Sequence, residues 1–284
     1  MILFYKNPQQ TKHQRIIENL YNSCPWGKKL LDTSTFSQNL RLNQKAKAIV
    51  FAGMIRGDGL IFKWCKQHNK RFFYIDHAYL NRGYNTDPDN EWFRVTDSDF
   101  LWNKMEHRNP DRWNQYFASN NIMLPWRLGK GKNILVLPPS QATQYLFPKS
   151  KLWLDQTVRT IKKHSDKPIV VREKPTQQII SANNQILKRL NFNHSRTIEQ
   201  ELDDAYAVVT YNSGVTVDAL LRGIPIFCDQ NNAAAPMTFN IEDMGNYILK
   251  DRQSWLHQLV HHQFLTREML NGKIWLDLIP DGKI

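Results

Sequence analysis

The chain has 284 residues, of which 41% are hydrophobic and 23% charged, and its formal net charge is +12. This composition is close to the globular average and excludes a disordered chain, while the length suits two domains of about 130 to 150 residues each. Three widely spaced cysteines, Cys24, Cys65 and Cys228, exclude a disulfide framework and a zinc motif, and the charge favours polyanionic partners.

The first series of elements begins with an apolar run at Met1–Tyr5 and a helical spacing over Thr11–Tyr21. Ala46–Ala52 has the pattern of a buried strand. A loop with three glycines then opens a helix that ends near His68, and Arg71–Ile75 is the next strand. This order of strand, loop, helix and strand predicts a parallel sheet.

The middle of the chain is irregular. Asn81–Asn90 has the composition of a loop, and Trp92–Trp126 mixes aromatic, charged and proline residues without a clear period. The second stretch is compatible with an insertion, an acceptor-binding lobe or a connection between domains. Gly129-Lys130-Gly131 suggests a hinge. We therefore expect an N-terminal domain at 1–128, a C-terminal domain at 129–258, and a tail at 259–284 on the outer surface.

A second series of strands and helices follows the glycines. Its predicted strands are Asn133–Leu137, Pro168–Val171, Ala205–Thr210 and Ile224–Cys228. Its predicted helices are Leu152–His164, Gln178–Leu190, Thr197–Asp204 with a capping box, Thr216–Arg222 closed by Gly223, Ile241–Leu249 and Ser254–Phe264. The two series together predict an α/β protein with two Rossmann-like domains that face a cleft.

The turn between the strand Ala205–Thr210 and the following helix carries the clearest chemical signal. Its residues Asn212, Ser213, Gly214 and Thr216 offer hydroxyls and backbone N–H groups at a helix start, where an anionic phosphate is stabilised. An ordinary capped helix is the alternative, since Ser and Asn are common caps.

Three other strand ends of the same domain carry polar residues. Pro139 and Ser140 follow the first strand, Arg172 and Lys174 the second, and Asp229 the last. The carboxyl ends of parallel strands meet at one edge of the sheet, where ligands bind. We therefore expect these side chains and the Ser-Gly turn to bind a phosphate-containing donor, with Asp229 on a sugar hydroxyl.

The segment from Asn212 to Pro225, a Ser-Gly turn, a helix and the run Ala-Leu-Leu-Arg-Gly-Ile-Pro, resembles the donor-binding signature of GT-B glycosyltransferases. It is most similar to the branch of capsule polysaccharide (Kdo-type) transferases, and Arg172-Glu173-Lys174-Pro175 resembles the basic element which that branch places on the donor phosphate. The resemblance covers residues 133–229 and implies a nucleotide-sugar donor. The acidic residue that grips the donor ribose in the family has two candidates here, Asp218 and Asp229.

Transfer to a hydroxyl group needs a base, and Asp76-His77 directly follows a predicted strand of the first domain. We expect Asp76 to be the base and His77 to be the second candidate; a turn or capping pair is the alternative. Positive charge suffices for a phosphate leaving group, so we expect no metal and no cofactor beyond the donor. The glycines of the loop at 53–59 do not have the spacing of a dinucleotide fingerprint.

Aromatic and basic residues alternate between Arg82 and Arg127, a pattern typical of surfaces that bind nucleic acids, although core aromatics with solvated basic residues give the same pattern. The compact size also resembles phage enzymes that glycosylate a hydroxymethylated base in double-stranded DNA, which would act in the host cytoplasm. A surface polysaccharide or lipid-linked glycan is an alternative acceptor, and a non-catalytic nucleic-acid-binding protein is an alternative function.

The N-terminus lacks a signal-peptide pattern and no apolar run is long enough for a membrane span, so we expect a cytoplasmic protein. The expected acceptor-binding residues are Arg56, Arg82, Trp92, Arg94 and Arg108.

Overall fold

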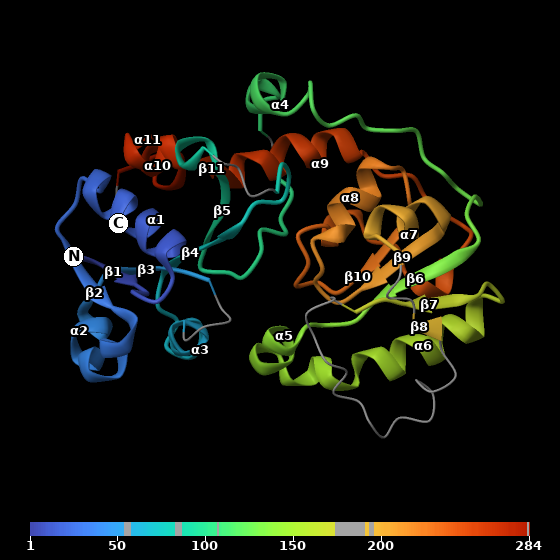
Figure 1. Ribbon diagram of the computed structural model, residues 1–284, viewed down its shortest axis with the longest axis horizontal. Coiled ribbons are helices and arrows are strands. Elements are labelled where there is room, and N and C mark those ends of the chain that lie inside the picture. Colours follow the sequence, from blue (N-terminus) through green and yellow to red (C-terminus); the bar gives the residue numbers. More distant parts are fainter. Residues whose placement is uncertain (54–57, 83–86, 107, 174–190, 193–195, 283) are drawn as a thin grey trace. The chain divides into compact units, whose positions relative to one another are not determined.

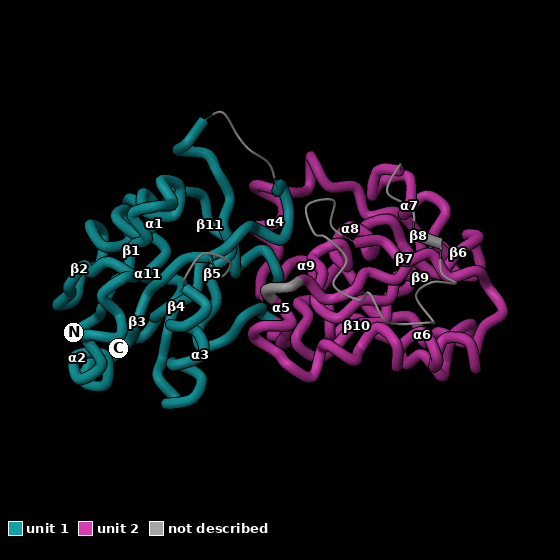
Figure 2. Tube along the Cα trace, turned by 60° about the horizontal axis from the view of Figure 1, so that its bottom comes forward, with its two compact units in different colours: residues 1–102, 259–284 teal, residues 103–258 magenta. Residues whose placement is uncertain are grey.

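The computed structural model describes residues 1–53, 58–82, 87–106, 108–173, 191–192, 196–282 and 284. These residues form two compact units, the first made of residues 1–102 and 259–284 and the second of residues 103–258 (Figure 2). The units differ from the sequence-based division at two points. Residues 103–128 belong to the second unit, and residues 259–284 are part of the first unit.

The first unit is built on a six-stranded sheet with the order β11-β5-β4-β3-β1-β2 (Figure 1). Its inner strands β1, β3 and β4 confirm the three predicted strands, and β2 pairs with β1 in parallel. β5 and β11 add two antiparallel strands at the other edge. The strands are β1 (Ile2–Lys6), β2 (Lys28–Asp32), β3 (Ala48–Ala52), β4 (Phe72–His77), β5 (Trp92–Asp97) and β11 (Gln263–Leu265).

One face of this sheet is covered by helices from both ends of the chain: α1 (Thr11–Ser23), α10 (Thr266–Leu270) and α11 (Lys273–Leu278). Side chains alternate between the two faces of a strand, so Phe4, Val50 and Ile75 share this face and belong to one core. The ring of Trp275 lies edge-on to Phe4, with the ring centroids 6.0 Å apart. The C-terminal residues therefore return to the first unit because they complete its core.

The opposite face of the sheet carries an aromatic core. It is covered by a 3₁₀ helix (Thr33–Asn39), α2 (Leu40–Lys45) and α3 (Gly59–Gln67). Tyr5 packs edge-on against Phe36, with centroids 5.1 Å apart, and Phe62 packs in the same way on Phe72 at 5.4 Å. Much of the high aromatic content of the first half of the sequence therefore stabilises this unit through burial and ring contacts.

The second unit has a five-stranded parallel sheet with the order β10-β9-β6-β7-β8. The chain order reverses between β6 and β9, as in Rossmann-type sheets, so the loops after these two strands diverge at the carboxyl edge. The four predicted strands are confirmed, and the α/β class is correct for both units. The strands are β6 (Asn133–Leu137), β7 (Ile169–Val171), β8 (Asn191–Phe192), β9 (Ala205–Thr210) and β10 (Ile226–Cys228).

Helices flank this sheet on both faces (Figure 1). Predicted helices are confirmed as α6 (Trp153–His164), α7 (Ile198–Asp204) and α8 (Val215–Leu221), and the capping box of Thr197 and Gln200 is present. Two further helices, α4 (Asp111–Tyr116) and α5 (Gln141–Leu146), were not predicted. The helix predicted over Gln178–Leu190 lies outside the described residues.

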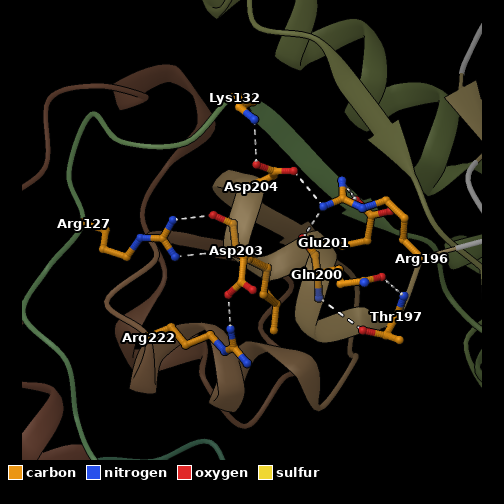
Figure 3. Close-up of polar contacts among 10 residues, drawn as sticks. Arg127, Lys132, Arg196, Thr197, Gln200, Glu201, Asp203, Asp204 and Arg222 are labelled. Carbon is orange, nitrogen blue, oxygen red and sulfur yellow. Dashed lines mark hydrogen bonds and ion pairs between the residues drawn. The ribbon is translucent and has the colours of Figure 1, made fainter.

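Ion pairs at the C-terminal end of α7 hold the segment that leads into β6 (Figure 3). Arg127 donates to the carbonyl oxygens of Leu202 and Asp203, and Lys132 Nζ lies 3.2 Å from Asp204 Oδ1. Asp204 Oδ2 also accepts a hydrogen bond from Arg196, at 2.7 Å. The segment in which a hinge was predicted, Gly129–Gly131, therefore lies inside the second unit and is fixed on both sides by these contacts.

Two predicted helices near the C-terminal end of the second unit were wrong in whole or in part. In the segment 241–249, only a 3₁₀ turn at Ile241–Asp243 forms, because Gly245 takes a left-handed φ of +102° that a helix cannot continue. The helix predicted over Ser254–Phe264 is α9 (Arg252–Leu259), which begins earlier and ends earlier. Its expected last turns become a 3₁₀ turn and β11, because β5 offers a strand edge for pairing.

Replacing Gly223 by Ala should destabilise the protein. Gly223 has a left-handed φ of +73°, and a Cβ there would lie 2.0 Å from the carbonyl oxygen of Pro125. The left-handed conformation alone costs a non-glycine residue about 1–2 kcal/mol. We expect a lower midpoint of chemical denaturation, measured by circular dichroism. Gly27→Ala is the control, because nothing lies within 4 Å of its Cβ position. Equal stability of the two variants would contradict the prediction.

Candidate functional site

Two polar loops meet where the order of the second sheet reverses. The loop after β6 contains Ser140, whose Oγ accepts a hydrogen bond from Thr143 N at 3.2 Å and so caps α5. The hydroxyl of Thr143 in turn donates to Asn212 Oδ1, 3.2 Å away in the loop after β9. The structure therefore brings the predicted residues Ser140 and Asn212 together at the switch point, which is the usual ligand-binding place of such sheets.

The Ser-Gly turn after β9 is held by its own hydrogen bonds. Ser213 N donates to Thr210 Oγ1, and Ser213 Oγ accepts from Val215 N, both at 3.3 Å. Thr216 is fully buried, and its hydroxyl donates to Ser213 O at 3.1 Å and to Asn232 Oδ1 at 2.9 Å. The Thr216 side chain thus serves the shape of the turn.

Asn232 is a residue of this region that the sequence did not reveal. It is 1% exposed, and its side chain bridges the loop after β10 and the Ser-Gly turn. Its Oδ1 accepts from Thr216 Oγ1 and from Ala234 N, and its Nδ2 donates to Ser213 O at 3.2 Å. The polar run from Asp229 to Asn232, directly after a buried strand, was the one available signal. Within this run, Asp229 Oδ1 accepts from the backbone N of Asn231 at 2.9 Å.

Replacing Asn232 by Ala should loosen the Ser-Gly turn. The change removes the acceptor of the buried Ala234 N and one of the two acceptors near the Thr216 hydroxyl, which keeps Ser213 O. A buried group left unsatisfied costs about 1–3 kcal/mol. We expect a lower denaturation midpoint and, because the turn loses its bridge, weaker binding of nucleoside diphosphates by calorimetry. Asn231→Ala is the matched control, since its amide reaches Asp229 and Tyr211 in the same loop. A variant as stable as that control would contradict this role of Asn232.

In the basic element after β7, Arg172 makes hydrogen bonds within the protein. The backbone N of Arg172 extends the sheet by donating to Val136 O at 3.0 Å, and its Nη1 donates to the carbonyl oxygen of Arg196 just before α7. Arg172 therefore lies at the carboxyl edge, as predicted from the sequence, and also fixes the start of α7. Lys174 lies outside the described residues. Contacts of Pro139, Arg172, Gly214 and Asp229 with a donor stay predictions.

In the first unit, Asp76 is surrounded by donors at the end of β4. Its Oδ2 accepts from the Tyr74 hydroxyl at 2.5 Å and from Arg94 Nη2 at 2.9 Å, and its Oδ1 accepts from His77 N at 2.8 Å. Burial by itself would raise the pKa of Asp76, but the Arg94 guanidinium and the Tyr74 hydroxyl outweigh burial and lower the pKa. Asp76 is therefore a stable carboxylate with little tendency to take up a proton at neutral pH.

Arg94, which the sequence suggested for acceptor binding, is the main partner of Asp76. It lies opposite Asp76 in the antiparallel pair β4–β5, and its Nη1 donates to His77 O at 3.0 Å. Its guanidinium lies 5.4 to 5.8 Å from the ring centroids of Tyr74, Tyr79 and Phe100.

The second predicted base, His77, is a neutral imidazole at pH 7, because desolvation lowers its pKa more than the charge of Asp76 raises it.

The other residues expected to bind the acceptor are divided between the two units: Arg82 and Trp92 belong to the first unit and Arg108 to the second. Arg108 forms an exposed ion pair with Glu106 at 3.1 Å, Arg82 is exposed, and Trp92 is half-buried in β5. Arg56 lies outside the described residues. Of the interleaved aromatics, Trp102 and Trp113 are buried, and the ring of Trp126 lies 4.1 Å from the Arg252 guanidinium. Trp102 and Trp113 therefore contribute to the core, whereas Trp126 is half-buried beside Arg252.

Two absences hold for the part of the chain that the structure describes. No group of three or more His, Cys, Asp or Glu side chains there could hold a metal ion. Among the helices of the same residues, none combines the length and the apolar character needed to cross a lipid bilayer.

Comparison with known proteins places this arrangement in a fold class. No protein-family model matches the chain, and no curated protein sequence matches it. Two solved structures from Thermosulfurimonas dismutans are similar over nearly their whole length. KpsC β-Kdo 2,7 transferase has a TM-score of 0.56 at 15% identity, over 97% of this chain and 99% of that one. KpsC β-Kdo 2,4 transferase has a TM-score of 0.53 at 11% identity, over 93% and 92%. The fold is of the GT-B type.

The GT-B similarity extends beyond the segment that resembles the donor signature. That resemblance covers residues 133–229, whereas the structural match spans 97% of the chain and so includes the first unit. The expected fold class of two Rossmann-like domains is thereby confirmed for both units.

Proposed function

We propose that the protein is a glycosyltransferase that moves a sugar from a nucleotide-sugar donor to a hydroxyl group of an acceptor. The observation that carries this proposal is the Asn212-Ser213-Gly214 turn at the switch point of a GT-B-type second unit, joined through Thr143 to the loop that contains Ser140. Ligands of open α/β sheets bind at this place, and the turn has the family's donor signature. The fold shared with the two Kdo transferases supports the same reaction class.

The polar groups at this edge suit the phosphate of a leaving nucleotide. Hydroxyls of Ser140 and Ser213 and the backbone of Gly214 provide uncharged donors, and Arg172 and Lys174 provide positive charge. As the bond from the sugar to the phosphate breaks, the phosphate gains negative charge, which such donors stabilise more in the transition state than before it. Asp229 supplies an acceptor for a hydroxyl of the ribose or the sugar.

We propose a saccharide hydroxyl as the first acceptor class. This choice is supported by the two similar structures, which are both Kdo transferases. A hydroxymethylated base in double-stranded DNA is the second candidate, and the formal net charge of +12 favours it. Stacking of aromatic rings on DNA bases is less favoured, because Trp102 and Trp113 are buried and Trp126 packs against the Arg252 guanidinium.

Transfer from a panel of radiolabelled CMP-, UDP- and GDP-sugars tests the proposal. Each donor is incubated with an oligosaccharide mixture, with duplex DNA, and with duplex DNA that contains 5-hydroxymethylcytosine. Label in oligosaccharide supports the first acceptor class, and label in hydroxymethylated DNA alone supports the second. If no donor is transferred and none is hydrolysed, the proposed function is contradicted and a non-catalytic binding protein is favoured.

Chelation of metal ions should leave turnover unchanged. We propose that the charge on the leaving phosphate is stabilised by the protein groups at the switch point, whereas a catalytic metal would supply several kcal/mol of that stabilisation. The rate with the active donor is measured before and after dialysis against EDTA, and again after Mg²⁺ or Mn²⁺ is restored. A loss that is reversed by the metal would contradict the expectation that no metal is required.

A further inference from the structure

The first unit has a switch point of its own. Its parallel strands have the order β2-β1-β3-β4, so the chain order reverses between β1 and β3. The loops after these two strands contain Asn7 and Asp58. Ligands of open α/β sheets bind outside the carboxyl ends of the two strands at such a reversal. By this rule Asp58 lies closer to the ligand-binding place of the first unit than Asp76, which is at the end of β4.

Asp58 is a buried carboxyl group with an unused acceptor. It directly precedes α3, and it is 3% exposed. Its side chain is hydrogen-bonded by Asn7 across the switch point, whereas among the described residues none donates a hydrogen bond to its Oδ1. An unsatisfied oxygen in a buried carboxyl group costs free energy, so its presence in a folded protein calls for a reason other than stability.

Asp58 and Asp76 act on the same neighbour, and their pKa values are shifted in opposite directions. Burial raises the pKa of Tyr74 well above its ordinary value, and the charges of Asp76 and Asp58 raise it further. Asp76 is kept ionised by Arg94. For Asp58, burial raises the pKa to about 7, against the lowering effect of the Asn7 hydrogen bond. Two nearby carboxyls with separated pKa values are typical of sites in which one holds charge and the other exchanges a proton.

We propose that Asp58 accepts the proton of the acceptor hydroxyl during sugar transfer, directly or through one water molecule. This inference rests on the proposed function. In the step, the acceptor oxygen forms a bond to the anomeric carbon and the bond from that carbon to the phosphate oxygen breaks. The phosphate keeps the electron pair of the broken bond, and the proton passes from the acceptor oxygen to Asp58 Oδ1. Asp76 keeps its charge in its ion pair with Arg94 throughout.

The test compares Asp58→Asn with two other variants. The Asn side chain has the shape of the protonated carboxyl but cannot take up a proton. We expect kcat with the donor found in the panel to fall by about 10²–10⁴-fold, the usual contribution of a positioned base. Binding of the nucleoside diphosphate, by calorimetry, should stay unchanged, because the second unit holds the donor. Asp97→Asn removes a carboxylate of β5 from its ion pair with Arg71 and should leave kcat unchanged.

The pH profile separates a base from a structural carboxyl. Wild-type kcat should rise as the pH passes through about 7, and this rise should be absent in Asp58→Asn. In Asp58→Ala, added formate should restore part of kcat, because formate supplies the missing carboxylate. The inference is overturned if the wild type transfers sugar and Asp58→Asn keeps its kcat and pH profile, or if His77→Gln removes the rise instead. If the wild type turns over no donor, the proposed function fails and this inference with it.

Discussion

Arg94→Met is expected to destabilise the protein by up to about 3–5 kcal/mol, the cost of removing one partner from a buried ion pair, because the side chains of Arg94 and Asp76 are only 11% and 21% exposed. The variant keeps an unbranched apolar side chain among Tyr74, Tyr79 and Phe100, so most of the packing remains. What it loses is the positive charge 2.9 Å from Asp76 Oδ2, and the carboxylate is then left buried without its cation. Chemical denaturation followed by circular dichroism measures the loss.

The pH dependence of this variant should be opposite to that of the intact pair. In the wild type the pKa of Asp76 is lowered, so its stabilising contribution is present above the ordinary carboxyl pKa and is lost as the pH falls through the folded-state pKa. Without Arg94, burial dominates and raises the pKa of Asp76. The Arg94→Met variant should therefore gain stability as the pH is lowered toward about 5.

Two controls identify the ion pair as the cause. The double variant Arg94→Met/Asp76→Asn should recover a large part of the lost stability, because it removes the unpaired charge. Arg71→Met breaks the more exposed pair with Asp97, 2.8 Å apart, and should cost at most about 1 kcal/mol. Equal losses in Arg94→Met and Arg71→Met would show that the Asp76–Arg94 pair is not effectively buried.

Asp58→Asn is expected to stabilise the protein at alkaline pH. The carboxyl of Asp58 has a pKa of about 7 in the folded protein, against an ordinary value of 3.8. At about 1.4 kcal/mol per pH unit, this difference amounts to about 4 kcal/mol. Because the folded-state pKa is raised, the favourable contribution is complete below the ordinary pKa and is lost as the pH rises through about 7. The neutral Asn avoids this loss.

The measurement is the free energy of unfolding at several pH values between about 4 and 8. The difference between Asp58→Asn and the wild type should grow with pH and level off above about 7, where the wild-type carboxyl is ionised. Asp97→Asn serves as the control with an exposed carboxylate, and it should show no such growth. A constant difference between Asp58→Asn and the wild type would mean that Asp58 ionises at an ordinary pH in the folded protein.

The first unit contains two carboxyl groups whose ionised forms have opposite effects on stability. Asp76 is stabilised by its partners as a carboxylate, whereas Asp58 is retained at a cost in stability at neutral and alkaline pH. Functional sites often carry such a cost, because a group poised near the working pH has to be desolvated. A stabilised Asp58→Asn variant that also loses turnover would connect the two effects in one residue.

Most of the parallel strands, and the position of the polar turn in the second unit, could be predicted from the amino-acid sequence. Buried strands are continuous apolar runs, so AIVFA in β3 and AYAVVT in β9 are recognisable without any partner. The turn Asn212-Ser213-Gly214 is likewise local, since a strand end, a polar pair and a helix start lie within a few residues. These local signals were sufficient to predict the α/β class and the resemblance to GT-B transferases.

Contacts between residues far apart in the sequence became known only from the folded chain. β5 and β11 alternate too briefly for a sequence signal. β5 becomes a strand because it pairs with β4, and β11 becomes one because it pairs with the free edge of β5, which lies far from it in the sequence. From the sequence, Arg94 was predicted to bind the acceptor, whereas antiparallel pairing places it opposite Asp76. Asn232 lies in a polar loop, and only the folded chain shows its hydrogen bond to the Ser-Gly turn. Asp58 became notable once burial left its Oδ1 without a partner. Pairing register and burial depend on contacts between segments far apart in the chain, and no local period of the sequence encodes them.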